Sequence, residues 1–162
     1  MAAPRARIGF LINPIAGMGG PVGLKGTDGL AEEAESKGGR ARASERARAC
    51  LCLLFSMKER ILFLTASGSM GRSCLDGCGL DCKEVYSSPL KSSAIDTIQA
   101  CQAFIAEGVD LILFCGGEGT ARGVGGGVGP TPPPGIPPGG EMDSGGFFAP
   151  PPAAAALVGG VV

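Results

Sequence analysis

The segment 111–123, LILFCGGEGTARG, combines residue types and spacing that could do chemistry. An apolar run leads directly into a glycine-rich turn, whose polar and glycine positions are Gly116, Gly117, Glu118, Gly119, Thr120 and Arg122. The exposed N–H groups of such a turn can surround a phosphate, and a helix that begins there adds the positive end of its dipole. In the first turn of that helix, Arg122 could pair with a phosphate oxygen.

The acid inside this turn needs a role of its own, because a phosphate would repel a carboxylate. Glu118 could hold a magnesium ion or accept the proton of an attacking hydroxyl. On this interpretation the turn is built for phosphoryl transfer. The alternative is an ordinary strand-to-helix turn in which Glu118 caps the helix or faces solvent.

A second glycine-rich loop, residues 14–29, follows the first apolar segment of the chain. It lacks the G-x-x-x-x-G-K-[ST] pattern, because Leu24 precedes Lys25, and it lacks G-x-G-x-x-G, because Val22 stands at the last position. Neither loop is therefore a standard P-loop or a dinucleotide fingerprint.

The chain contains no histidine. This excludes a Ser-His-Asp triad, a Cys-His pair and a histidine zinc site within it. Its seven cysteines form no C-x-x-C pair, and we interpret them as core or surface thiols of a reducing cytoplasm. Cys74, Cys78 and Cys82 recur every four residues and could share one helix face.

The composition fits one domain with a sizeable core, since 44% of the 162 residues are hydrophobic. A net charge of −1 implies neither nucleic acid nor an anionic membrane as a partner. The apolar runs are too short to span a bilayer. The first run ends at Asn13 and Pro14, which indicates a strand rather than a signal peptide.

Strand and helix patterns alternate along the first two thirds of the chain. Strands are expected at 7–13, 60–65, 83–86 and 109–115, and helices or helical turns at 30–37, 45–58 (with Ser44 as N-cap), 71–78 and 93–107. In the last of these helices, Ser93 and Asp96 resemble a capping box, and Gly108 supplies the stop. The order predicts an α/β fold with a parallel sheet covered on both faces, with ligands beyond the carboxyl ends of the strands.

Residues 123–162 differ in kind, with twelve glycines and nine prolines among them. Proline removes a ladder donor, so the segment PTPPPGIPPGG cannot be a central strand. By composition we expect this tail to be irregular.

Two stretches together resemble a known family. IGFLINPIAGMGGPVGLKGTDG (8–29) and GVDLILFCGGEGTARGV (108–124) are similar to the two signature segments of the ATP-NAD kinase family, in particular its AcoX-like branch. The wider superfamily, with diacylglycerol and sphingosine kinases, carries a G-G-D-G-T motif that residues 116–120 match except at Glu118. The resemblance is strong to residue 122 and weaker beyond.

The resemblance implies a three-layer Rossmann-like parallel sheet and a kinase that transfers the γ-phosphoryl group of ATP to the 2′-hydroxyl of NAD, giving NADP, with Mg²⁺ or another divalent metal. Polyphosphate replaces ATP in some relatives. By position, Glu118 would activate the acceptor hydroxyl or help to hold the metal. Nucleotide phosphates would be held in a cleft lined by Asn13, Gly17, Gly19, Gly20, Gly116, Gly117, Gly119, Thr120 and Arg122.

The sequence also departs from the family pattern. Glu118 stands where the family has Asp, and Gly123 where an acid usually follows. We expect a nucleotide-binding domain at 1–122 and a degenerate continuation at 123–162, without the family's β-rich C-terminal domain. A non-catalytic nucleotide-binding or regulatory domain, or a kinase for another small hydroxyl acceptor, are the alternatives. We expect a cytoplasmic homo-oligomer, since an uncovered sheet would expose apolar surface.

Overall fold

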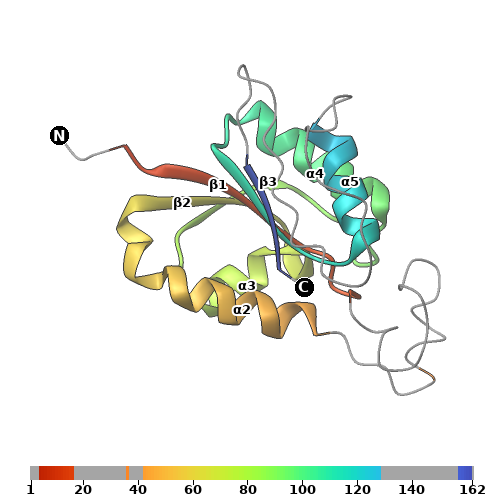
Figure 1. Cartoon of the computed structure of the whole chain (residues 1–162), viewed down its shortest axis with the longest axis horizontal. Helices are drawn as coiled ribbons and strands as arrows, with labels where there is room; N and C mark the ends of the chain where they lie inside the picture. The colour runs from red at the N-terminus through yellow and green to blue at the C-terminus, as the bar shows by residue number, and fades with distance from the viewer. Residues whose placement is uncertain (1–3, 17–35, 37–41, 129–156, 162) are drawn as a thin grey trace, which may run out of the picture.

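The fold is a five-stranded parallel sheet with helices on both faces (Figure 1). The computed structural model describes residues 4–16, 36, 42–128 and 157–161. The strands are β1 (Ala6–Ile12), β2 (Ile61–Ala66), β3 (Cys82–Tyr86), β4 (Leu111–Cys115) and β5 (Leu157–Val161). The α-helices are α2 (Ala43–Leu54), α3 (Arg72–Gly77), α4 (Ala94–Ala106) and α5 (Glu118–Val128), with 3₁₀ helices η2 (Phe55–Arg60) and η3 (Gly68–Met70).

Two apolar layers sandwich the sheet. Helices α2 and α3 cover one face, and α4 and α5 cover the other (Figure 1). The side chains of β1 alternate between these two layers. Phe10 packs in the α2–α3 layer and Leu11 in the α4–α5 layer. A strand buried on both faces reads as a continuous apolar run, as the sequence predicted.

The strand order β3-β2-β1-β4-β5 places a topological switch point beside β1. Strand β1 pairs in parallel with β2 on one side and with β4 on the other. After β3 the chain therefore crosses over β2 and β1 and adds β4 on the other side of β1. Strand β5 then pairs with β4 at the outer edge. The carboxyl ends of β1 and β4 are adjacent, with Ile12 in register with Cys115. Ligands of open α/β sheets bind in the crevice that such a reversal leaves.

The fold class expected from the sequence is confirmed, and the predicted helix at 45–58 corresponds to α2 followed by η2. The predicted N-cap is wrong, because Arg42 precedes the helix and Ser44 lies inside it. Tertiary packing explains the earlier start: Ala43 is buried, and its carbonyl accepts a hydrogen bond from the Cys115 thiol at 3.2 Å. The predicted helix at 30–37 lies outside the described residues, apart from Ser36.

The cysteines spaced four apart do not share a helix face. Helix α3 ends at Gly77, and Cys82 is the first residue of β3. The backbone reverses at Gly79, whose positive φ of 65° breaks the helical path. All seven cysteines are free thiols. Burial raises the pKa of Cys101 to about 12, as expected for an inert core thiol.

The glycine-rich tail is more regular at its two ends than its composition predicts. Helix α5 runs on to Val128, and β5 pairs in parallel with β4. The glycines of α5 allow the close approach of α4, since a Cβ on Gly127 would lie 2.6 Å from the Cβ of Cys101. The expectation of irregular structure is therefore wrong for 123–128 and 157–161, and the proline-rich part lies outside the described residues.

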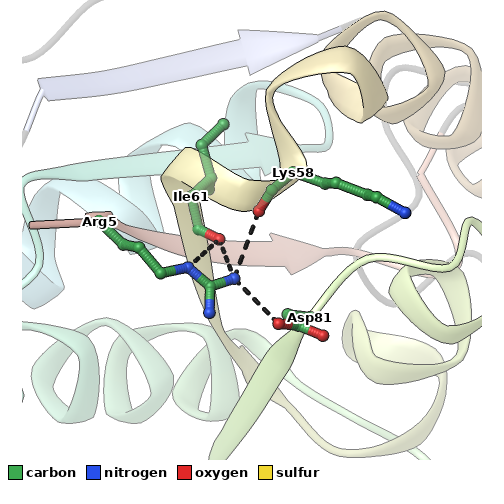
Figure 2. Close-up of polar contacts among 4 residues, drawn as sticks. All are labelled: Arg5, Lys58, Ile61 and Asp81. Atoms are coloured by element: carbon green, nitrogen blue, oxygen red, sulfur yellow. Dashed lines mark hydrogen bonds and ion pairs between the residues drawn. The ribbon is translucent and has the colours of Figure 1, made fainter. Parts of the chain in front are cut away.

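Charged side chains tie the strands together at their amino ends. Figure 2 shows the Arg5 guanidinium donating hydrogen bonds to the carbonyls of Lys58 and Ile61 and pairing with Asp81. This one side chain therefore joins the segment before β1 to the start of β2 and the turn before β3. None of the described helices is long and apolar enough to cross a membrane.

Candidate nucleotide site

Asn13 connects the two loops that leave β1 and β4. Its backbone N–H donates to the carbonyl of Cys115 at 2.8 Å, which extends the β1–β4 pairing by one step. Its side-chain Nδ2 donates to Oγ1 of Thr120 at 3.0 Å, and its Oδ1 accepts the N–H of Ile15 at 3.2 Å. Asn13 therefore fixes the first turn after β1 and holds it against the start of α5.

Gly116 makes this contact possible. It is buried at the end of β4, and a Cβ there would lie 2.3 Å from Oγ1 and 2.5 Å from Cβ of Thr120. Contacts that short do not occur between real side chains, so the turn requires glycine for reasons of space. Gly117 differs, because a Cβ there would meet nothing within 4 Å.

Helix α5 begins directly at this turn, at Glu118. The N–H of Ala121 donates to the carbonyl of Gly117 at 3.0 Å, which closes the first turn of the helix. The N–H groups ahead of it have no partner within a helix and can bind an anion. The side chain of Glu118 lies outside the described residues, and Arg122 is exposed one turn further along.

A pocket of about 370 Å³ opens beside this turn, within the usual size range of ligand pockets of roughly 300–1,000 Å³. Its lining comes from the β1 loop, η3, the start of α4 and the start of α5. The lining residues are Asn13, Ile15, Met70, Ser92, Ser93, Ala94, Thr97, Gly119 and Thr120. None of them is charged, and five carry a hydroxyl or amide group.

The α4 wall of the pocket is held by a buried carboxylate. Oδ2 of Asp96 accepts the backbone N–H of Ser93 at 2.7 Å and its hydroxyl at 2.8 Å, and Oδ1 accepts the hydroxyl of Tyr86 at 2.8 Å. Burial works to raise the pKa of Asp96, but the bonds from Ser93 and Tyr86 outweigh it and leave the pKa below its ordinary value. Asp96 is therefore held as the carboxylate, and the predicted capping box is confirmed.

The structure brings several of the predicted site residues together. Asn13, Gly119 and Thr120 line the pocket, and Gly116 contacts Thr120. Gly17, Gly19 and Gly20 lie outside the described residues, so their predicted role is untested.

The α4 side of the pocket was not predicted from the sequence. Ser92, Ser93 and Thr97 line it, together with Met70 of η3. Ser93 and Asp96 were recognised only as helix-start signals. The position of α4 immediately after β3 was the available clue, because the helix begins at the carboxyl edge of the sheet, where ligands bind.

The described residues do not form a closed metal cage. They contain no group of three or more histidine, cysteine, aspartate or glutamate side chains placed to hold an ion. Magnesium commonly needs fewer protein ligands, because it keeps several waters and binds one or two carboxylates together with substrate phosphates. Glu118 is the carboxylate that the turn carries in the sequence, and its role as a metal ligand stays a prediction.

The comparison with known protein families identifies the family of the chain. The model of the ATP-NAD kinase N-terminal domain matches residues 8–161, which span all five strands except the first two residues of β1. Searches of curated proteins and of solved structures found no match. Because the family model covers nearly the whole chain, the chain belongs to the ATP-NAD kinase family and carries its N-terminal domain.

Proposed function

We propose that the chain is an ATP-dependent phosphotransferase that phosphorylates the 2′-hydroxyl of NAD to give NADP. The observation that carries the proposal is the Asn13–Thr120 hydrogen bond at the switch point between β1 and β4. It holds the glycine turn beside a neutral pocket, so that phosphates and an uncharged part of a nucleotide can bind next to each other. Family membership supports the kinase chemistry.

In this proposal each part of the turn has a defined task. The N–H groups from Gly117 to Thr120 bind phosphate oxygens at the start of α5. Glu118 accepts the proton of the acceptor hydroxyl, or holds the divalent ion, and Arg122 pairs with a phosphate oxygen. When bound, Mg²⁺ supplies positive charge that offsets the phosphate charge.

NADP formation tests the proposal. The full chain would be incubated with Mg-ATP and NAD, and NADP would be detected with an NADP-specific dehydrogenase. We expect product from the wild-type chain and none above background from Glu118→Ala. Circular dichroism and a melt of the variant should match the wild type, because alanine favours a helix and Glu118 is the first residue of α5.

Glu118→Asp is the informative companion variant, because it restores the acid that the family motif carries at this position. A misplacement of roughly 1 Å can cost on the order of a hundredfold in rate. If the longer side chain of Glu118 limits the reaction, Glu118→Asp will be faster than the wild type. NADP formation by Glu118→Ala at the wild-type rate would remove Glu118 from the mechanism.

The glutamate also favours a second candidate function, a nucleotide-binding domain without turnover. This candidate predicts that Mg-ATP raises the melting temperature while neither the wild type nor Glu118→Asp makes NADP. A kinase with another acceptor would hydrolyse or transfer the phosphate of ATP only when that acceptor is added. We propose the cytoplasm as its location, in keeping with seven free thiols.

A further inference from the structure

Thr97 is a buried residue of the pocket whose hydroxyl has no hydrogen-bond partner among the described residues. It lies in the first turn of α4, is 5% exposed, and lines the pocket. Its side-chain oxygen makes no hydrogen bond with any described residue, and it is not sealed off from the pocket, because Nε of Arg7 is the only enclosed side-chain atom without a partner among the described residues. A hydroxyl that is open to the pocket and unused by the described residues can form a hydrogen bond with a group that the pocket binds.

The packing of Thr97 explains why the fold does not need this hydroxyl. A Cβ placed on Gly123 of α5 would lie 3.1 Å from the Cγ2 methyl of Thr97, so the methyl group faces α5 at close range. Valine has the same shape and would fill this space equally well. The hydroxyl therefore adds nothing to the α4–α5 contact and remains available to the pocket.

Two neighbouring hydroxyls give the pocket a defined hydrogen-bonding character. Ser93 donates its hydroxyl hydrogen to Asp96, so it can offer only an oxygen lone pair to a ligand. Thr120 accepts a hydrogen bond from Asn13, and no described residue takes its hydrogen, so it can donate. Acceptor and donor groups in one uncharged pocket suit a sugar diol, whose hydroxyls both donate and accept.

We propose that the Thr97 hydroxyl is a specificity-determining group that hydrogen-bonds a ribose hydroxyl of the bound nucleotide. The proposal rests on the proposed function for the identity of the ligand, and it goes further by assigning the ribose to the pocket. A phosphate is less suited to this position, because none of the lining residues that the structure describes is cationic. The ribose of ATP and that of NAD share the required chemistry, and the experiment separates them.

Calorimetric titration of the full chain tests the proposal without requiring turnover. Wild type, Thr97→Val and Thr97→Ser are titrated with ATP, with its 2′-deoxy and 3′-deoxy forms, and with NAD and NAD deoxygenated on the adenosine ribose. Thr97→Val should weaken the ribose nucleotide about three- to tenfold, the range for one neutral hydrogen bond. It should leave unchanged the binding of the analogue that lacks the contacted hydroxyl, and Thr97→Ser should bind like the wild type.

The nucleotide series in which this pattern appears identifies the ribose that occupies the pocket. Equal affinity of wild type and Thr97→Val for every ligand would overturn the proposal. So would an equal loss for ribose and deoxyribose forms, or a matching loss with inorganic tripolyphosphate, which would indicate a phosphate contact. Failure to bind any ribose nucleotide would overturn it as well.

The outcome is distinguishable from that of the proposed function. The titration can show the Thr97 pattern when no NADP forms, in which case the pocket assignment stands and the kinase reaction falls. NADP formation with no effect of Thr97→Val on binding would support the kinase reaction and overturn the pocket assignment.

Discussion

Charged groups join the strands at the amino edge of the sheet, whereas hydroxyl, amide and glycine residues shape the carboxyl edge. At the amino edge, Asp110 accepts the N–H of Arg7 at 2.8 Å, and Glu107 pairs with Lys83 at 2.8 Å. At the carboxyl edge, Asn13 reaches Thr120 beside an uncharged pocket. The amino end is therefore joined by bonds within the chain, and the carboxyl end is where we propose that a ligand binds.

Arg5 at the amino edge and Thr97 at the carboxyl edge use their polar groups differently. Arg5 directs its guanidinium at groups of this chain, two carbonyls and a carboxylate (Figure 2). Thr97 is more deeply buried and yet has no partner among the described residues. Polar groups that are satisfied internally stabilise the fold, and those left unpaired in a pocket are available to bind.

The largest effect is expected at Gly116. Replacement with alanine would place a methyl group 2.3 Å from Oγ1 of Thr120, so the turn must shift. Overpacking of this kind costs about 1–3 kcal/mol in unfolding free energy. Nucleotide binding should also fall at least tenfold, because the shift breaks the Asn13–Thr120 contact. Urea denaturation and calorimetry measure the two effects.

Gly117→Ala is the matched control for this prediction, since its new methyl group would meet nothing within 4 Å. Its unfolding free energy should stay within about 0.5 kcal/mol of wild type. Equal destabilisation by the two variants would show that the turn is not packed as described.

A similar loss of unfolding free energy is expected when Gly127 of α5 is replaced. Gly127→Ala would bring a Cβ within 2.6 Å of Cys101 and 2.9 Å of the carbonyl of Ile98, pushing α5 away from α4. We expect a loss of about 1–3 kcal/mol in unfolding free energy. Gly126→Ala, which meets nothing within 4 Å, should instead stabilise by about 0.5–1 kcal/mol through helix propensity. Thermal or urea unfolding with the same sign for both variants would contradict the position of α5.

At the amino edge, Arg5→Ala should lower the unfolding free energy by about 1–2 kcal/mol, because hydrogen bonds from a charged group are lost from a partly exposed site. The affinity for Mg-ATP should not change, since Arg5 lies at the opposite ends of the strands from the pocket. The unfolding free energy of Arg5→Lys should lie between those of wild type and Arg5→Ala, because lysine keeps the charge and loses the forked geometry. A drop in nucleotide affinity would refute the separation of the two edges.

The smallest effect concerns pH at the same edge. The hydrogen bond from Lys83 lowers the pKa of Glu107 below its ordinary value of 4.5, with Arg7 adding to the effect. A carboxyl with a lowered pKa stabilises the folded state above the unfolded-state value, and this contribution is lost as the pH falls through the folded-state value. Unfolding free energies from pH 7 to 3 should therefore fall less steeply for Glu107→Gln than for wild type. Identical slopes would show that the pair contributes nothing measurable.

Much of the fold could be predicted from the sequence, because the residues that determine these elements lie close together along the chain. The apolar run before Gly116 and the Ser93–Asp96 capping box each fall within a few residues, and both elements formed where expected. The N-cap predicted at Ser44 is wrong because the start of α2 depends on a distant contact between Ala43 and Cys115. The glycines of α5 favoured a prediction of irregular structure. Their role in a helix becomes clear only from the close packing of α4 against α5, which the local sequence does not show.

The candidate site was only half predictable for the same reason. The Gly116–Thr120 turn stands out in the sequence, and Asn13 ends a strand at the other loop. Thr97 gives no such signal, since a threonine in a helix is unremarkable until its partners are known. Its isolation depends on how α4 sits between β3 and α5, which is a property of the tertiary structure.

Backbone hydrogen exchange with and without Mg-ATP tests most directly whether the carboxyl edge binds nucleotide while the amino edge does not. We predict added protection at 13–16, 93–97 and 116–121, with little change at 58–61, 81–83 and 107–110. Protection confined to the amino edge, or no change at either edge with saturating Mg-ATP, would contradict this prediction.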